Sequence, residues 1–278
     1  MRLLRGELRK LIRRPASRIT LIIQLAIILL IYVAVAASYR TLTQTTTQNA
    51  EESRAGIRLL LPFPGAYAGV IGLITQLGGL LAIGYGASAA GADWGWGMVK
   101  VAVARGESRS RYILAKLVAV LLMLAVGLLI SFVIGVLIAI IAALIAGIDM
   151  AGIGDSSVVG QLPEQLLRGW WGIAEEATIG FAIATFARSQ LAGLGAGIAL
   201  YFVESFSTLF LPDVVRYLPF HVASSALRLT AVGGGGGGGG AGASTALDPG
   251  LSLVLVTVYL VIAAIASAVI IERAEISG

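Results

Sequence analysis

The chain has 278 residues, of which 58% are hydrophobic and 13% are charged, and its formal net charge at pH 7 is +5. Soluble domains carry about 25% charged residues, so this composition excludes a soluble enzyme, a disordered regulator and a nucleic-acid-binding domain. The absence of cysteine and the single histidine, His221, exclude a disulfide and a His- or Cys-rich metal site. The composition predicts an all-α integral membrane protein.

Six apolar runs are long enough to cross a hydrocarbon core about 30 Å thick, which takes about 17–25 residues. They cover residues 20–38, 67–90, 112–147, 169–187, 191–211 and 251–271. The third run contains no polar turn, so it predicts one long helix that projects from the bilayer. The sequence therefore predicts six transmembrane helices in a single domain, residues 1–278.

The basic residues gather on one side of these spans. Six crossings place both termini on the same face, and fourteen of the twenty Lys and Arg residues belong to that face. Because cytoplasmic flanks are enriched in Lys and Arg, we expect a multi-pass protein of the inner or plasma membrane with both termini in the cytoplasm. The first run is longer than the core of a signal peptide, about 7–15 residues, which favours a retained span.

The N-terminal segment 2–14 predicts a helix that ends before Pro15. Its apolar residues share an arc of about 100°: Leu4, Leu8, Leu11 and Ile12. Such an amphipathic interfacial helix, within residues 1–19, would turn its leucines towards the bilayer and its basic side chains towards the phosphates of membrane lipids. The alternative is a basic flank that only sets the topology, and both interpretations stay open.

The cytoplasmic segment 91–111 joins the second and third spans. It carries Trp94 and Trp96, a short apolar stretch at 99–104, and then Ser108 in a position to begin the next helix. This pattern favours a short helix held between two spans, which would act as a lever because force on it moves both spans. A plain basic loop is the alternative.

Four segments, taken in order, resemble the permease subunits of type-2 ABC exporters, and the resemblance covers nearly the whole chain. They are residues 7–15, residues 93–97 together with 108–116, residues 187–190, and residues 218–221. The resemblance implies a transmembrane permease that moves a substrate out of the cytoplasm. It also implies a second permease copy or a homologue, and an ABC ATP-binding subunit, expected in two copies.

In this family the first cytoplasmic loop is a coupling helix seated in a groove of the ATPase, so the resemblance places that contact within residues 95–105. The residues that it assigns to the contact are Trp96, Met98, Val99, Lys100, Ala104 and Arg105. The external loop 212–250 departs from the family because it is enlarged by a glycine tract.

The glycine tract, residues 233–240, is not followed by the Lys-Ser or Lys-Thr pair of a phosphate-binding loop. We interpret it as a flexible linker. We therefore expect no catalytic residue, cofactor or metal in this chain, and expect ATP and Mg to be bound by the partner ATPase.

Three glutamates fall within the predicted spans, Glu175 and Glu176 in the fourth and Glu204 in the fifth. A charged carboxylate at the centre of a bilayer costs at least about 2.5–3.5 kcal/mol, so these residues are candidates for a substrate or ion pathway. In the alternative, Glu175 and Glu176 reach water at the outer interface, and Glu204 is a neutral acid hydrogen-bonded inside the bundle. If these glutamates carry ions, the protein would instead be an ion-coupled secondary transporter, which is the alternative function.

Gly193 and Gly197 form a small-xxx-small step in the fifth span. Small residues let helices approach closely in lipid. The step predicts close helix packing, either within the chain or in a dimer.

Overall fold

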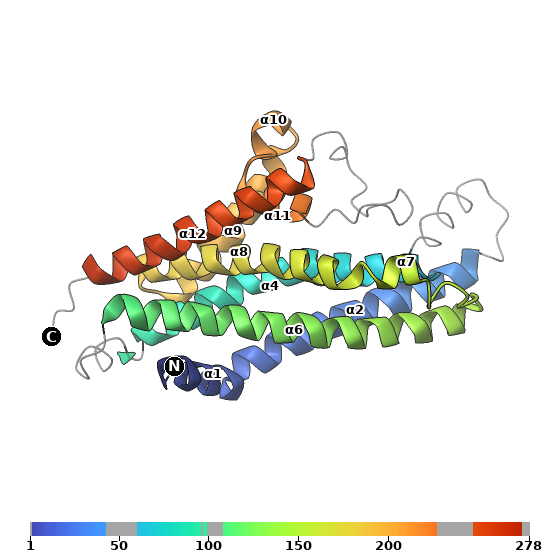
Figure 1. Ribbon diagram of the computed structural model, residues 1–278, viewed down its shortest axis with the longest axis horizontal. Helices are drawn as coiled ribbons and strands as arrows, with labels where there is room; N and C mark the ends of the chain where they lie inside the picture. The colour runs from blue at the N-terminus through green and yellow to red at the C-terminus, as the bar shows by residue number, and fades with distance from the viewer. Residues whose placement is uncertain (1, 43–59, 96, 99–107, 227–246, 274–278) are drawn as a thin grey trace.

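The computed structural model describes residues 2–42, 60–95, 97–98, 108–226 and 247–273. In these residues the fold is all-α, without a strand. Long helices lie side by side in a bundle, and α1 begins at the end of the bundle where α12 finishes (Figure 1). The helices are α1 (Arg2–Arg13), α2 (Pro15–Leu42), α4 (Gly65–Gly95), α6 (Arg109–Ala146), α7 (Ser156–Val159), α8 (Leu162–Ala187), α9 (Gln190–Ser207), α10 (Pro212–Val215), α11 (Pro219–Ala226) and α12 (Pro249–Arg273).

Four helices among the described residues are long and apolar enough to cross a membrane: α2, α4, α6 and α12. They coincide with the first, second, third and sixth predicted spans. The helices α8 and α9 cover the fourth and fifth predicted spans but are not among these four, and α8 carries Glu175 and Glu176 in its middle. Large apolar side chains are exposed along α2, α6 and α12, as suits contact with hydrocarbon chains. The fold is compatible with a multi-pass membrane protein.

The third apolar run forms one uninterrupted helix, α6, of 38 residues. The helix starts after Ser108 and ends at Gly147, whose φ of 72° lies in the left-handed region that favours glycine. The N–H of Ile148 donates to the carbonyl of Ala143 at 3.0 Å and so satisfies one of the last carbonyls of the helix.

Several helix ends differ from the predicted spans, among them the start of α8 and the end of α9. Helix α8 begins at Leu162, seven residues before the predicted start, with Pro163 in its first turn, where proline is tolerated. Helix α9 ends at Ser207, four residues before the predicted end. The hydroxyls of Ser207 and Thr208 donate back to carbonyls of the preceding turn, and Pro212 then starts α10. Such local hydrogen bonds compete with continuation of a helix.

The central helix is α4, which packs against α2, α6, α8 and α9 and most extensively against α8. Two glycines face this contact from opposite sides. A Cβ atom at Gly86 of α4 would overlap the carbonyl of Ala177, and one at Gly180 of α8 would overlap the carbonyl of Ile83. The absence of these side chains lets the two backbones approach closely.

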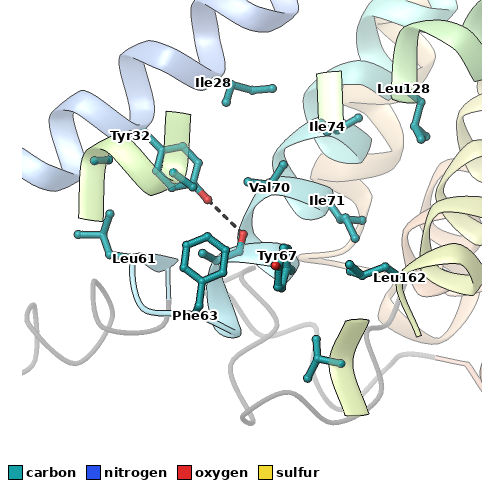
Figure 2. Close-up of a cluster of buried hydrophobic side chains, with 14 of the residues drawn as sticks. Ile28, Tyr32, Leu61, Phe63, Tyr67, Val70, Ile71, Ile74, Leu128 and Leu162 are labelled. Carbon is teal, nitrogen blue, oxygen red and sulfur yellow. Dashed lines mark hydrogen bonds between the residues drawn. The ribbon is translucent and has the colours of Figure 1, made fainter. Parts of the chain in front are cut away.

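At the end of the bundle away from α1, buried apolar side chains join α2, α4, α6 and α8 (Figure 2). Two tyrosines add hydrogen bonds to this cluster. The hydroxyl of Tyr32 donates to the carbonyl of Ala66 at 3.3 Å, and that of Tyr67 donates to the carbonyl of Ile153 at 2.8 Å. Together these contacts fix the start of α4 against its neighbours.

Candidate functional site

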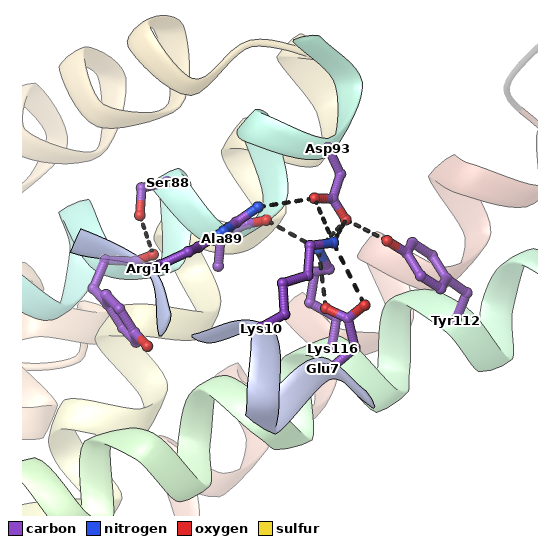
Figure 3. Close-up of polar contacts among 9 residues, drawn as sticks. Glu7, Lys10, Arg14, Ser88, Ala89, Asp93, Tyr112 and Lys116 are labelled. Carbon is purple, nitrogen blue, oxygen red and sulfur yellow. Dashed lines mark hydrogen bonds and ion pairs between the residues drawn. The ribbon is translucent and has the colours of Figure 1, made fainter. Parts of the chain in front are cut away.

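At the end of the bundle where α1 lies, charged side chains from three helices meet in what we call the ionic cluster (Figure 3). Its members are Glu7, Lys10 and Arg14 at α1, Asp93 of α4, and Tyr112 and Lys116 of α6. The cluster ties the N-terminal helix to the end of α4 and the start of α6.

The centre of the ionic cluster is the carboxylate of Asp93, which is 2% exposed. Its Oδ1 atom lies 3.1 Å from Lys10 Nζ and 3.1 Å from Arg14 Nη2. Its Oδ2 atom accepts hydrogen bonds from the hydroxyl of Tyr112 and from the ammonium of Lys116. One carboxylate therefore holds partners from both α1 and α6.

The ammonium of Lys116 is completely buried and has a second carboxylate partner, because Glu7 Oε2 lies 3.3 Å from its Nζ. The cluster thus combines three cationic side chains with two carboxylates. Taking charges out of water costs several kcal/mol each, which only close pairing and hydrogen bonds offset. Removal of one member would leave a buried charge without its partner.

Helix α1 reaches the cluster because its sequence has two different faces. Glu7 and Lys10 share a face with Leu11, which is 1% exposed and packs with Ile113 and Leu117 in a buried apolar cluster. The prediction that the leucines of this helix point towards lipid is therefore wrong for Leu11, because α6 covers it. The exposed basic side chains of α1 lie on the other side: Arg5, Arg9 and Arg13.

The predicted ATPase contact, residues 95–105, begins two residues after Asp93 of the ionic cluster. Of the residues assigned to the ATPase contact, Trp96, Val99, Lys100, Ala104 and Arg105 lie outside the described residues. Met98 is described and is partly buried.

The tryptophan next to Asp93 has a partner from another part of the chain. The guanidinium of Arg188, in the turn between α8 and α9, lies 5.3 Å from the ring centroid of Trp94. In the same region, a Cβ atom at Gly91 would overlap the backbone of Gln190. The α8–α9 turn therefore packs against the end of α4, close to the ionic cluster.

The three predicted pathway glutamates are all buried in the protein. Glu175 is 0% exposed and Glu176 is 7% exposed, so the alternative in which they reach water at the membrane surface is wrong. Helix α8 is covered by α4, α9, α11 and α12, which the sequence of α8 alone does not reveal. Glu204 is also buried and accepts a hydrogen bond from the backbone N–H of His221.

The partners of these glutamates differ. Within the described residues, both carboxylate oxygens of Glu175 and the Oε2 atom of Glu176 are buried without a hydrogen-bond partner. The carboxylate of Glu176 fills the space beside Gly79 of α4, where a Cβ atom would overlap it. In the described part of the chain, no three His, Asp or Glu side chains are arranged to hold a metal ion.

Both glycines of the small-xxx-small step in α9 face other helices of the same chain. A Cβ atom at Gly193 would overlap Ala184 of α8, and one at Gly197 would overlap the side chain of Ile83 of α4. The close packing lies within the chain at both positions, and a dimer contact at these residues stays a prediction.

Comparison with known proteins gives a family for this chain. Residues 67–277 match the family described as protein of unknown function (DUF2705), and the chain belongs to it. The match runs from the first turn of α4 past the end of α12, and so includes Asp93, Lys116 and the three glutamates. No curated protein matches the sequence.

Proposed function

We propose that this protein is the permease subunit of a type-2 ABC exporter, which moves a substrate out of the cytoplasm with a separate ATPase. The observation that supports this most is the ionic cluster. Two of the segments that carry the resemblance, residues 7–15 and residues 93–97 with 108–116, supply all of its members. A third such segment, residues 187–190, packs beside them through Arg188. Segments far apart in the sequence thus converge at one end of the bundle.

The proposed topology has six spans: α2, α4, α6, α8, α9 and α12. The protein lies in the inner or plasma membrane, and both termini are in the cytoplasm. The common end of α1 and α12 supports an even number of crossings (Figure 1). Helix α8 carries charge, but its neighbours cover Glu175 and Glu176. A helix with buried acids is tolerated in a membrane when other helices separate those acids from lipid.

In the proposed mechanism the partner ATPase binds ATP and Mg and pushes on residues 95–105. Asp93 lies two residues before this segment, and Lys116 lies in the third turn of the helix that follows it. Because the two side chains are paired, α1, α4 and α6 would move as one unit. This chain would supply no catalytic residue, and a second permease copy or a homologue would complete the pathway.

Co-purification of the full-length protein from its native membrane tests this proposal. We expect a soluble subunit with a Walker motif to accompany the wild-type protein, and expect the double substitution Lys100→Glu and Arg105→Glu to release it. Arg168→Glu is the matched control, because Arg168 lies near the opposite end of α8 and makes only a local pair with Glu164. A wild-type protein that transports its substrate without any ATPase would overturn the proposal.

A second candidate function, an ion-coupled secondary transporter, is favoured by one observation. Both carboxylate oxygens of Glu175 are buried without a partner in the described structure. Transport assays in sealed vesicles separate the two functions, since an ion gradient alone drives the secondary transporter and ATP drives the exporter. Unchanged transport by Glu204→Gln would remove Glu204 from either pathway.

A further inference from the structure

A cavity of about 120 Å³ lies between α2, α4 and α6, and Ile173 of α8 also lines it. It is separate from the ionic cluster and from the three glutamates, none of which lines it. Its walls are almost entirely apolar and include Leu21, Ile74 and Leu128. Apolar cavities in proteins stay dry and bind apolar molecules of matching size.

One polar side chain in the wall has an unused acceptor. Gln24 is 5% exposed, and its Nε2 atom donates to the carbonyl of Leu73 at 3.4 Å. Its Oε1 atom is buried without a hydrogen-bond partner. A buried acceptor without a partner costs about 1–3 kcal/mol. A ligand with a hydrogen-bond donor would remove that cost.

Two other polar side chains of the lining, Ser17 and Tyr85, already have hydrogen-bond partners within the protein. The hydroxyls of Ser17 and Tyr85 lie 3.0 Å apart and bond to each other, and Ser17 also donates to the carbonyl of Leu11. Of these three side chains, Gln24 is therefore the one that has a buried acceptor without a partner.

The cavity reaches the molecular surface along α6. Two of its wall residues there are well exposed, Val126 at 51% and Ile130 at 38%. Between them is Gly127, where an added Cβ atom would meet nothing within 4 Å. The neighbouring exposed side chains of α2 and α6 are also apolar, for example Ile23 and Leu129. In a bilayer, this opening would face the hydrocarbon.

We propose that the cavity binds the hydroxyl end of a membrane-soluble molecule that has a hydrocarbon chain and one hydroxyl group, with the hydroxyl donating to Gln24 Oε1 and the rest of the chain extending past Gly127 towards the bilayer. The molecule enters sideways from the bilayer past Gly127. The site goes beyond the proposed export function, because binding requires the folded chain in a membrane and neither ATP nor a partner subunit.

Binding of radiolabelled 1-dodecanol to the full-length protein in lipid nanodiscs tests the site, with empty nanodiscs as the background. We expect saturable binding at one site per chain. Dodecyl methyl ether has the same chain but no donor, so we expect it to compete about threefold to tenfold less well than 1-dodecanol. Equal competition by the ether would overturn the role of Gln24, and binding no greater than that of empty nanodiscs would overturn the site.

Two substitutions locate the ligand. Gly127→Leu fills the open space and should abolish saturable binding, whereas Gln24→Leu should remove the preference for the alcohol over the ether. Gly72→Leu is the matched control, since it adds the same side chain to α4 where a Cβ atom also meets nothing within 4 Å, outside the cavity. Unchanged alcohol binding by a folded Gly127→Leu protein would contradict the proposal.

A dodecanol carrying a diazirine gives a readout on the wild-type protein alone. We expect cross-links at Gln24 and within residues 126–131, which saturating 1-dodecanol suppresses. Cross-links confined to other residues would overturn the assignment, whatever the folding of the variants.

Discussion

The backbone of Gly86 in α4 lies against the carbonyl group of Ala177 in α8, with no side chain between the two helices. The reciprocal contact of Gly180 with the carbonyl of Ile83 is made by the same pair of helices. In lipid, where burial of apolar surface does not drive helices together, such close approach supplies much of the attraction. The close approach of α4 and α8 therefore requires glycine at both Gly86 and Gly180.

We predict that Gly86→Ala lowers the free energy of unfolding by about 1–3 kcal/mol, because the methyl group has no space and the helices must separate. Thermal unfolding of the protein in detergent micelles, followed by circular dichroism, measures the effect. Gly72→Ala in the same helix is the control. It meets no neighbour, and the better helix propensity of alanine should leave stability equal or higher. Equal melting of both variants would contradict the packing.

Asp93→Asn should destabilise the protein by about 3–5 kcal/mol, because it leaves Lys116 buried without its main counter-charge. The double variant Asp93→Leu with Lys116→Met should recover part of that loss, since it removes both charges together. The unfolding midpoint in detergent gives the comparison. Arg5→Gln, on the exposed side of α1, should change stability by less than about 0.5 kcal/mol. An equally large loss in Arg5→Gln would rule out a specific role of the cluster.

Neighbouring residues of α1 distinguish packing on the protein from packing on lipid. Leu11→Ala should cost about 2–5 kcal/mol because Leu11 is 1% exposed and belongs to the buried apolar cluster that includes Ile113 and Leu117 of α6. Ile12→Ala should cost less than about 1 kcal/mol because Ile12 is 54% exposed. Chemical denaturation in mixed micelles measures both. Similar losses at the two positions would place α1 away from α6.

Glu175→Met should raise the unfolding midpoint, by an amount equivalent to about 1–3 kcal/mol, because it removes two buried oxygens that have no partner. If Glu175 serves transport, the same variant should transport more slowly, as expected where function keeps an unfavourable residue in place. Differential scanning fluorimetry and a vesicle transport assay give the two readouts. A lower midpoint would show instead that the carboxyl group of Glu175 stabilises the fold.

The main helices could be predicted from apolar run length, because a span of known thickness sets how many residues it needs. The unbroken run before Gly147 correctly indicated a single long α6. The end of α9 could not be placed that way, since the apolar residues after Ser207 continue while hydroxyl hydrogen bonds and Pro212 end the helix.

The ionic cluster could be predicted only in part. Its members all lie in the segments that resemble the permease family, but no local pattern predicts that Asp93 pairs with both α1 and α6. The burial of Glu175 and Glu176 was likewise hidden, because it depends on the helices packed around α8. Hydropathy reports which helices enter the membrane and not which faces they turn towards one another.

The ionic cluster also constrains the order in which the protein is made. Lys10 and Asp93 are 83 positions apart, and Lys116 emerges from the ribosome later still. The N-terminal helix is synthesised first, yet it cannot take its final place until α6 has been threaded into the membrane. Its docking is thus a late event in biogenesis, because Glu7 and Lys10 of α1 meet Asp93 and Lys116 only after α2, α4 and α6 have been made.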